Sequence, residues 1–352
     1  MPVRPGIAVV IPTRDRPASL RRLLDALARQ DRLPDQVIVV DAGRPPADPD
    51  TIRAPDRPFP ITHIGAAPGV CAQRNVGIRL ARHPYVLLCD DDIEPPREYL
   101  ARLVVHLEHE NLVAVTGLLS EPGPDGAFRS GFEVPSLRHI VFAFLFQVTV
   151  WGDVEAMRTA GISRPLLAAL KRWYRRRGNT FTLAGWPLLT QVRGPVVRTA
   201  LYGLGAALVR REWLLRSPFD ERLGPHGIGD NYGVALGFPG DRSIAVIADL
   251  PVRHHRAPEN RLAAAETYFR RVLALDLFLR SDRRFSRFSR AALAWSLVGN
   301  AVRFGARGRW QLAARSLHAL ARVTTGRNPL LRGTADPAGR RGGHAGAEPG
   351  AG

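Results

Sequence analysis

Residues 85–92 read YVLLCDDD, five apolar or aromatic residues followed directly by three aspartates. A short apolar run of this kind is typical of a strand that is buried on both faces of a sheet. The carboxylates of Asp90, Asp91 and Asp92 would repel one another inside a core, so we expect them just beyond the end of the strand. In an open parallel sheet, that edge is where ligands bind. The triplet predicts either a site for a divalent cation and a phosphate group, since Mg²⁺ and Mn²⁺ prefer oxygen ligands, or a solvated acidic turn before the next helix.

The sequence on both sides of this stretch alternates short apolar runs with helical patterns. Runs typical of strands occur at 7–11, 37–40, 61–64, 112–116, 206–209 and 244–247, and helical patterns at 17–27, 70–82 and 96–110. Strands that alternate with helices form a mostly parallel sheet with helices on its faces. Towards the C-terminus only helical patterns follow, at 259–280, 288–304 and 309–324. We therefore predict an α/β fold with a mostly parallel central sheet and a helical C-terminal extension.

The charge of the chain is concentrated in its second part. The 352 residues contain 50 Lys and Arg and 32 Asp and Glu, which gives a net charge of +18. Residues 1–135 are near neutral at −2, whereas residues 136–352 carry +20. A localised positive excess indicates an anionic partner, which is nucleic acid, an anionic membrane surface or a phosphorylated ligand.

Simple features exclude several classes of protein. Two cysteines, Cys71 and Cys89, cannot form a disulfide framework, which favours a reducing compartment. The apolar residues before Pro12 are too few for a signal peptide, and the longest uncharged apolar stretch, 140–152, is too short to span a membrane. A P-loop is excluded because the only lysine, Lys171, does not follow a glycine.

Asp41 follows the predicted strand 37–40 in the same way as Asp90 follows its own strand. Two carboxylates at the ends of two strands can bind one ligand, for example a donor group of a base or a ribose. The alternative is an ordinary Asx turn before Gly43.

Three further groups of residues are candidates for chemistry. In the helix that begins at GVCAQRNVG, Arg74 and Asn75 either reach a phosphate or a neighbouring loop, or Arg74 forms an ordinary ion pair. Asp230, in a glycine-rich stretch, is either a general base or a helix N-cap. The pair His254 and His255 follows an extended segment and either completes a metal site or lies on the surface.

Taken together, these motifs resemble family 2 glycosyltransferases with a GT-A fold, in the family's order over about 6–257. The matching segments are IAVVIPTR at 7–14 (the opening strand and nucleotide-contacting turn), VIVVD at 37–41 (the strand whose final aspartate contacts the base), GVCAQRNVG at 69–77, the DXD-type triplet at 90–92, the acceptor-side segments at 205–212 and 219–221, and the late strand with His254.

The resemblance implies an inverting enzyme that moves a sugar from a nucleotide-diphosphate sugar to a hydroxyl of a glycan or lipid-linked acceptor, as in polysaccharide biosynthesis. It implies Mg²⁺ or Mn²⁺ as the cofactor, held by Asp92 together with His254 or Asp91, with His255 as the alternative to His254. It also implies Asp230 as the catalytic base. The implied substrate-binding residues are Thr13, Arg14, Asp41, Arg74, Asn75, Asp90 and Asp91. One departure is that the family carries Glu-Asp where this chain has Asp230-Asn231, so that either Asp230 is the base or the base position holds Asn231.

The resemblance over the first part of the chain, and the helical patterns and composition beyond it, together indicate how the chain is organised. We expect a nucleotide-sugar-binding half over 1–120, an acceptor-binding half over 121–258, a basic amphipathic helical extension over 259–332 and a disordered tail over 333–352. Aromatic and leucine residues interleave the arginines of the extension, among them Trp295, Phe304, Trp310 and Leu317.

That interleaving fits either peripheral contact with anionic lipid or a solvated arginine-rich face over a helical core. We expect a cytoplasmic protein that is peripheral at the inner face of the cell membrane.

Two functions other than sugar transfer remain as alternatives. A nucleic-acid-binding protein would explain the positive charge but not the acidic triplet. A catalytically silent sugar-nucleotide-binding or membrane scaffold is suggested by Asn231.

Overall fold

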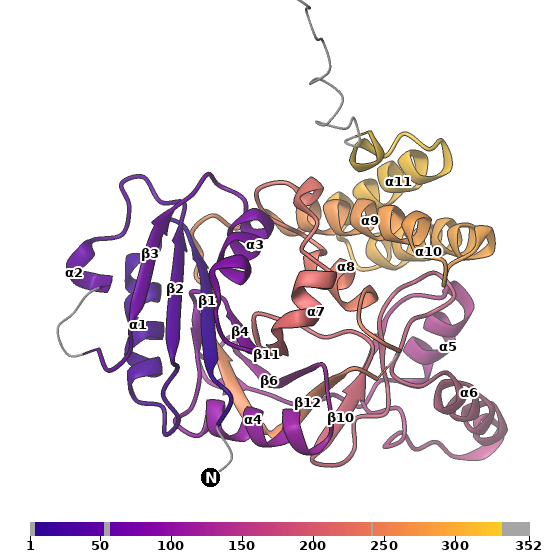
Figure 1. The fold of residues 1–352 in the computed structure, drawn as a ribbon. Coiled ribbons are helices and arrows are strands. Elements are labelled where there is room, and N and C mark those ends of the chain that lie inside the picture. The colour runs from indigo at the N-terminus through magenta and orange to yellow at the C-terminus, as the bar shows by residue number, and fades with distance from the viewer. Residues whose placement is uncertain (1–3, 53–56, 241, 333–352) are drawn as a thin grey trace, which may run out of the picture.

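The computed structural model describes residues 4–52, 57–240 and 242–332, in which a large sheet is flanked by helices and further helices lie beside it (Figure 1). The expected tail, 333–352, lies outside the described residues. The strands are β1 (Ile7–Thr13), β2 (Gln36–Asp41), β3 (Ile61–Gly65), β4 (Tyr85–Cys89), β5 (Ile93–Glu94), β6 (Ala114–Pro122), β7 (Phe128–Arg129), β8 (Val150–Trp151), β9 (Leu188–Leu189), β10 (Val196–Thr199), β11 (Ala206–Arg210) and β12 (Ile244–His254). The helices are α1 (Pro17–Ala28), α2 (Pro49–Ile52), α3 (Val70–Leu80), α4 (Tyr99–His109), α5 (Leu137–Phe146), α6 (Arg164–Arg177), α7 (Arg211–Arg216), α8 (Asp230–Leu236), α9 (Ala264–Ser281), α10 (Arg287–Gly305) and α11 (Trp310–Thr324).

Within the described residues, the main sheet has ten strands, eight of which follow the order β10-β12-β6-β11-β4-β1-β2-β3. Strands β3, β2, β1 and β4 are parallel, and β12 is parallel to β6. Strand β11 runs antiparallel between β4 and β6 and so joins the two parallel parts. The predicted mostly parallel α/β sheet with a helical C-terminal region is confirmed. The register pairs Thr13 with Asp41, which brings the carboxyl ends of β1 and β2 level.

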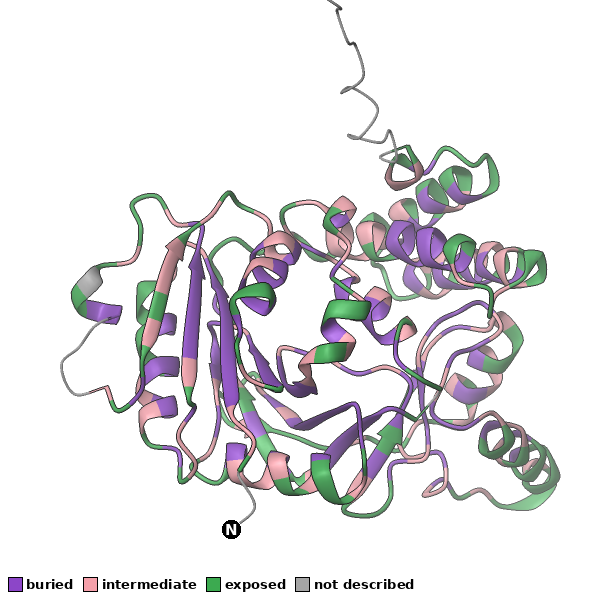
Figure 2. Cartoon of the chain, in the orientation of Figure 1, coloured by how far each residue is buried: buried purple, intermediate pink, exposed green. Residues whose placement is uncertain are grey.

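Alternate residues of β1 pack on opposite faces of the sheet. Ile7, Val9 and Ile11 join a core that includes the leucines of α1 and α4, whereas Ala8 and Val10 join the core that includes α3. Burial on both faces explains why this strand is a continuous apolar run, and β1 is buried along its whole length in Figure 2.

The C-terminal helices share a core with the sheet. Residues 272–279 of α9 are all buried, and Phe278 stacks on Tyr232 of α8 with ring centroids 5.7 Å apart. The hydrophobic cluster that contains these residues also contains Ala8 and Val10 of β1. Sequence and structure agree on the three helices, and α9 anchors them to the rest of the protein. No helix in the described ranges is long and apolar enough to cross a membrane.

Two helices, α5 and α6, lie where the sequence pattern indicated no element. Helix α5 reads LRHIVFAFLF and is apolar on nearly all sides, so it shows no helical periodicity. In α6 a basic cluster ends the apolar pattern, although Leu167, Leu170 and Tyr174 are buried at helical spacing. The two helices pack together in a small core of their own.

The strand predicted at 244–247 is longer in the structure. It continues to His254, with a shift in register after Ile247.

A close approach of α3 to the sheet accounts for Gly77. A Cβ atom at this position would lie 2.4 Å from Cγ1 of Val10, which is itself fully buried. We therefore predict that Gly77→Val destabilises the protein by about 1–3 kcal/mol, the usual cost of overpacking a core. Urea unfolding measures this change. Gly65→Val is the matched control, because nothing lies within 4 Å of a Cβ there. Equal stability of the two variants would contradict the packing.

Candidate functional site

The carboxyl ends of β1, β2 and β4 meet at one edge of the sheet. Thr13 ends β1, Asp41 ends β2, and Asp90 follows β4. Gln73 of α3 fastens this edge, because its side-chain amide donates to the carbonyl oxygens of Thr13 (2.9 Å) and Val40 (2.8 Å). The edge on which the acidic residues gather is therefore the one that the sequence predicted.

Asp91 is buried and points towards the start of α1. Its Oδ2 accepts a hydrogen bond from the Thr13 hydroxyl at 2.8 Å, and its Oδ1 accepts one from Nη1 of Arg16 at 3.0 Å. Burial raises the pKa of Asp91 to about 6, although Arg16 and the Thr13 hydrogen bond oppose the shift. Asp91 is thus hydrogen-bonded to both Thr13 and Arg16. Arg16 also donates to the carbonyl oxygen of Glu259.

Asp92 is buried as well, and it faces the segment that follows β12. Its Oδ2 accepts from the backbone N–H of Ala257 at 2.9 Å and from Nη2 of Arg261 at 2.8 Å. Its Oδ1 lies 3.4 Å from Nε2 of His254, whose Nδ1 faces Oε1 of Glu121 at 3.2 Å. Burial alone would raise the pKa of Asp92, but His254 and the two nearby arginines lower it to about 2.

The donor set of Asp92 and His254 fits a hard divalent cation. Two adjacent ligands of an octahedral ion, each about 2.1 Å from it, lie about 3 Å apart, which is close to the separation between Oδ1 and Nε2. Glu121 on Nδ1 is the kind of carboxylate that orients a metal-binding imidazole. No cluster of three or more His, Cys, Asp or Glu in the described ranges is placed to hold a metal. Nη2 of Arg261 lies 2.8 Å from Oδ2 of Asp92 and 3.4 Å from Nε2 of His254. The assignment of these two side chains as metal ligands, with a substrate diphosphate and water completing the shell as is usual for Mg²⁺, stays a prediction.

Arg74 joins the acidic triplet to the candidate base. Its guanidinium donates to Oδ1 of Asp90 through Nη2 and to Oδ2 of Asp230 through Nη1, and it lies over the ring of Phe219 at 5.0 Å. Arg74 is buried, with 5% of its surface exposed. Gly205 makes room for the pair, because a Cβ there would lie 2.2 Å from Oδ2 of Asp90.

Asp230 begins α8 directly after Gly229, whose positive φ of 98° is readily adopted only by glycine. Its Oδ1 accepts from the backbone N–H of Asn231 at 2.7 Å, while its Oδ2 is held by Arg74. Burial raises the pKa of Asp230, and the charge of Arg74 opposes that rise. The side-chain oxygen of Asn231 is buried and has no hydrogen-bond partner among the described residues. Of Asp230 and Asn231, it is therefore Asp230 whose side chain is linked to Asp90 through Arg74.

Asn75 and Arg14, the two remaining candidates for substrate binding, have different surroundings. Asn75 exchanges two hydrogen bonds of 2.9 Å with the backbone of Phe219 and donates another to Glu221, so it holds that segment against α3. Arg14 pairs instead with Asp15 at 3.4 Å, at the rim of this edge. The substrate-binding role expected of both residues stays a prediction.

Asp41 forms the Asx turn that was its alternative interpretation. Its Oδ1 accepts from the N–H of Gly43 and its Oδ2 from that of Ala47, each at 2.7 Å, while Nε2 of His63 on β3 lies 3.2 Å from Oδ2. Each carboxylate oxygen already has a partner, which orients the group firmly. A role in binding the base remains a prediction.

Sequence reasoning missed four residues of this site, namely Arg16, Gln73, Glu121 and Arg261. Arg16 and Gln73 lie within three residues of motifs that were recognised, so their position next to those motifs is a usable signal. Glu121 and Arg261 reach the site from the end of β6 and from the segment after β12. No local pattern marks them, because only the pairing of β12 with β6 brings them together.

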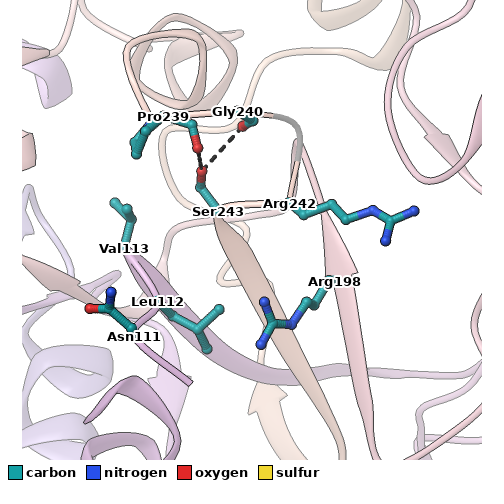
Figure 3. Close-up of a pocket in the computed structure, with 8 residues that line it drawn as sticks. All are labelled: Asn111, Leu112, Val113, Arg198, Pro239, Gly240, Arg242 and Ser243. Atoms are coloured by element: carbon teal, nitrogen blue, oxygen red, sulfur yellow. Dashed lines mark hydrogen bonds between the residues drawn. The ribbon is translucent and has the colours of Figure 1, made fainter. Parts of the chain in front are cut away.

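The hollow drawn in Figure 3 lies at the opposite edge of the sheet. It has a volume of about 460 Å³ and is lined by residues that include Leu112, Arg198 and Ser243, near the amino ends of β6 and β12. The hydroxyl of Ser243 donates to the carbonyl oxygens of Pro239 and Gly240, which also line the pocket. This pocket contains none of the carboxylates described above, so it is not the donor site.

Comparison with known proteins agrees with the motifs. Residues 8–156 match the model of the family described as Glycosyl transferase family 2. A Bacillus subtilis protein, "Uncharacterized glycosyltransferase YwdF", is 31% identical over 86 residues, which are 24% of this chain and 32% of that protein. The "Pre-mycofactocin glycosyltransferase" of Mycobacterium tuberculosis is 24% identical over 229 residues, covering 58% of this chain and 48% of that protein. The matches therefore span from a third to a half of the relatives' own lengths.

Solved structures share the fold. S. aureus TarS 1–349 in complex with UDP-GlcNAc has a TM-score of 0.51 at 13% identity, covering 90% of this chain and 81% of that chain. The mannosyltransferase PcManGT from Pyrobaculum calidifontis, in complex with GDP-Man and Mn²⁺, has a TM-score of 0.51 at 15% identity, covering 92% and 88%. Residues 8–156 thus match glycosyltransferase family 2, and the chain shares the GT-A fold of these structures, as its motifs predicted.

The ion pairs of Arg74 yield a prediction on stability. Arg74→Ala leaves Asp230 without its counter-charge in a buried position, so we predict a loss of about 3–5 kcal/mol at neutral pH. The loss should shrink as pH falls, because burial raises the pKa of Asp230 and protonation removes its uncompensated charge. Urea unfolding at several pH values measures both effects. Arg97→Ala, which removes an exposed pair with Asp31, should change stability by less than about 1 kcal/mol. A loss from Arg74→Ala that is the same at every pH would contradict the electrostatic explanation.

Proposed function

We propose that this protein transfers a sugar, with inversion, from a nucleotide-diphosphate sugar to a hydroxyl of a glycan or lipid-linked acceptor, and that transfer requires Mg²⁺ or Mn²⁺. The observation that carries the proposal is the convergence of Asp90, Asp92, His254 and Asp230 at one edge of the sheet, with Arg74 between two of them. The fold supports it, since the related structures of TarS and PcManGT are complexes with UDP-GlcNAc and with GDP-Man and Mn²⁺, respectively.

The donor is expected along the ends of β1, β2 and β4. Asp41 is oriented by Gly43 and Ala47 at the base end, and Asp90 lies nearer the centre of the edge. Arg16, held against Asp91, keeps positive charge beside the diphosphate position. When bound, a divalent ion held by Asp92 and His254 would neutralise charge on the departing diphosphate.

Asp230 is proposed as the base that takes the proton of the acceptor hydroxyl. The charge of Arg74 favours the ionised carboxylate and holds its Oδ2, whereas Oδ1 accepts the N–H of Asn231 and has a second lone pair that could take the proton. The same guanidinium orients Asp90, so the donor side and the base are positioned by one group. An acceptor between them would be held for in-line attack.

The metal assignment is tested with Asp92. We predict that Asp92→Asn lowers metal-dependent transfer about 100-fold, because a neutral amide is a poor ligand for a hard cation. The measurement titrates UDP, GDP and dTDP with and without Mn²⁺, followed by a donor screen with mass-spectrometric detection. Asp125→Asn, an exposed carboxylate that pairs with Arg129, is the control. Unchanged turnover of Asp92→Asn would remove Asp92 from the metal site.

The base is tested with Asp230. We predict that Asp230→Asn abolishes transfer and retains nucleotide binding, whereas Asn231→Asp brings no gain. Because burial raises the pKa of Asp230 and the base must be ionised, kcat/KM should fall as pH decreases through a value above the usual pKa of about 3.9. A gain of activity in Asn231→Asp would instead place the base at 231. Nucleotide binding without turnover in the unmodified protein would favour the silent scaffold, which the occupied oxygens of Asp230 also allow.

A further inference from the structure

Helices α5, α6 and α10 form one end of the molecule, at the right of Figure 1. Ring contacts join them, since Phe144 of α5 meets Trp173 of α6 with centroids 5.1 Å apart, and Phe146 stacks on Trp295 of α10 at 4.9 Å. The indole N–H of Trp295 also donates to the carbonyl oxygen of Leu145 at 2.9 Å. The outward-facing apolar residues here, which we call the end surface, are Phe144, Leu145, Ile162, Leu166, Trp173 and Trp295.

The end surface is strongly exposed for apolar side chains. Ile162 is 95% exposed, Leu145 58%, and Leu166 and Trp295 48% each. Phe288 and Val302 are also exposed, and they lie seven residues before and after Trp295, on the same face of α10. Of the residues that interleave the arginines of the extension, Phe304 is buried in the helical core, whereas Trp295, Trp310 and Leu317 are exposed.

Helix α6 has one apolar face that is buried and a second that is exposed at Leu166 and only partly covered at Trp173, which packs beside the α5–α6 core. Leu167, Leu170 and Tyr174 pack into the core that it shares with α5. Leu166 and Trp173 are seven residues apart on another face, and Ile162 precedes Leu166 by four residues. A second apolar face on a surface helix calls for a second apolar environment.

The charged residues on helices α5, α6 and α10 are all cationic. Lys and Arg number one on α5, six on α6 and three on α10, and none of the three helices contains Asp or Glu. Arg175 pairs with Glu155, but Arg164, Arg172 and Arg176 have no carboxylate partner among the described residues. Their positive charge is therefore available to an anionic partner.

We propose that the end surface docks on an anionic lipid bilayer. The exposed Ile, Leu, Phe and Trp side chains would enter the interface, and the arginines of α6 would meet lipid phosphates. Nucleic acid would match the charge but not the aliphatic side chains. A second copy of the chain would match the apolar residues but would bring the same cations face to face, as a two-fold interface requires. A bilayer satisfies both features.

This inference stands independently of sugar transfer, and its test needs no activity. Co-sedimentation of the full chain with phosphatidylcholine vesicles, with and without phosphatidylglycerol, measures the partition constant. We expect binding only when the anionic lipid is present. Leu145→Ser with Leu166→Ser, and separately Arg172→Gln with Arg176→Gln, should each lower the constant about tenfold or more, since each pair removes two contacts with the interface.

Matched controls lie elsewhere on the surface. Leu80→Ser with Leu215→Ser removes leucines that are 43% and 45% exposed on α3 and α7, and Arg22→Gln with Arg29→Gln removes exposed arginines at α1. Both should bind as the unmodified protein does. Circular dichroism and thermal unfolding confirm that every variant is folded.

Three results would overturn the proposal. One is an absence of vesicle binding, or binding that the end-surface variants do not reduce below the controls. Another is a dimer in analytical ultracentrifugation that dissociates in the leucine variant, which would make the end surface an interface between copies. The third is a preference for an RNA oligonucleotide over vesicles, lost in the arginine variant and kept in the leucine variant.

Discussion

A single buried guanidinium, that of Arg74, holds the two acidic parts of the site together. Asp90 comes from the end of β4 and Asp230 from the start of α8, and the two carboxylates would repel each other without the arginine between them. Arg74 can lie there because Gly77, one turn along α3, allows that helix to sit directly on β1. Asn75, on the same turn, fastens the 219–221 segment, so one short helix positions both sides of the proposed reaction.

The rest of the acidic edge follows the same principle of paired charges, with different results for each carboxylate. Asp91 accepts hydrogen bonds from Thr13 and Arg16, which are close to each other in the sequence, yet its burial still raises its pKa. Asp92 gains His254 and Arg261 from beyond β12, and its pKa falls. The low pKa keeps Asp92 ionised at neutral pH, as a ligand for a hard cation must be. Adjacent residues of one triplet thus acquire distinct properties from their different neighbours.

The cationic part of the chain is not uniform either. Helix α9 is buried and ties the C-terminal helices to the core of the sheet. The exposed apolar residues gather instead on α5, α6 and α10, where cations are frequent and carboxylates are lacking. The excess positive charge of this part of the chain therefore comes from two groups of cationic side chains. One group covers a helical core, and the other surrounds the end surface.

The sequence by itself determined β1, β2, β3, β4, β6, β11 and β12, although not β10 or the two-residue strands. It also determined the order of the motifs and the edge at which the carboxylates gather, because a strand buried on both faces must be apolar and its polar continuation must lie outside the core. It also determined α9, α10 and α11, although not α5, whose apolar circumference hides its periodicity. Only the tertiary structure decided the partners. Arg74 meets Asp230 across 156 residues and Asp92 meets Arg261 across 169. Such pairs depend on how distant elements pack, and the Asx turn of Asp41 shows that even a local role can be settled by backbone geometry that the residue types leave open.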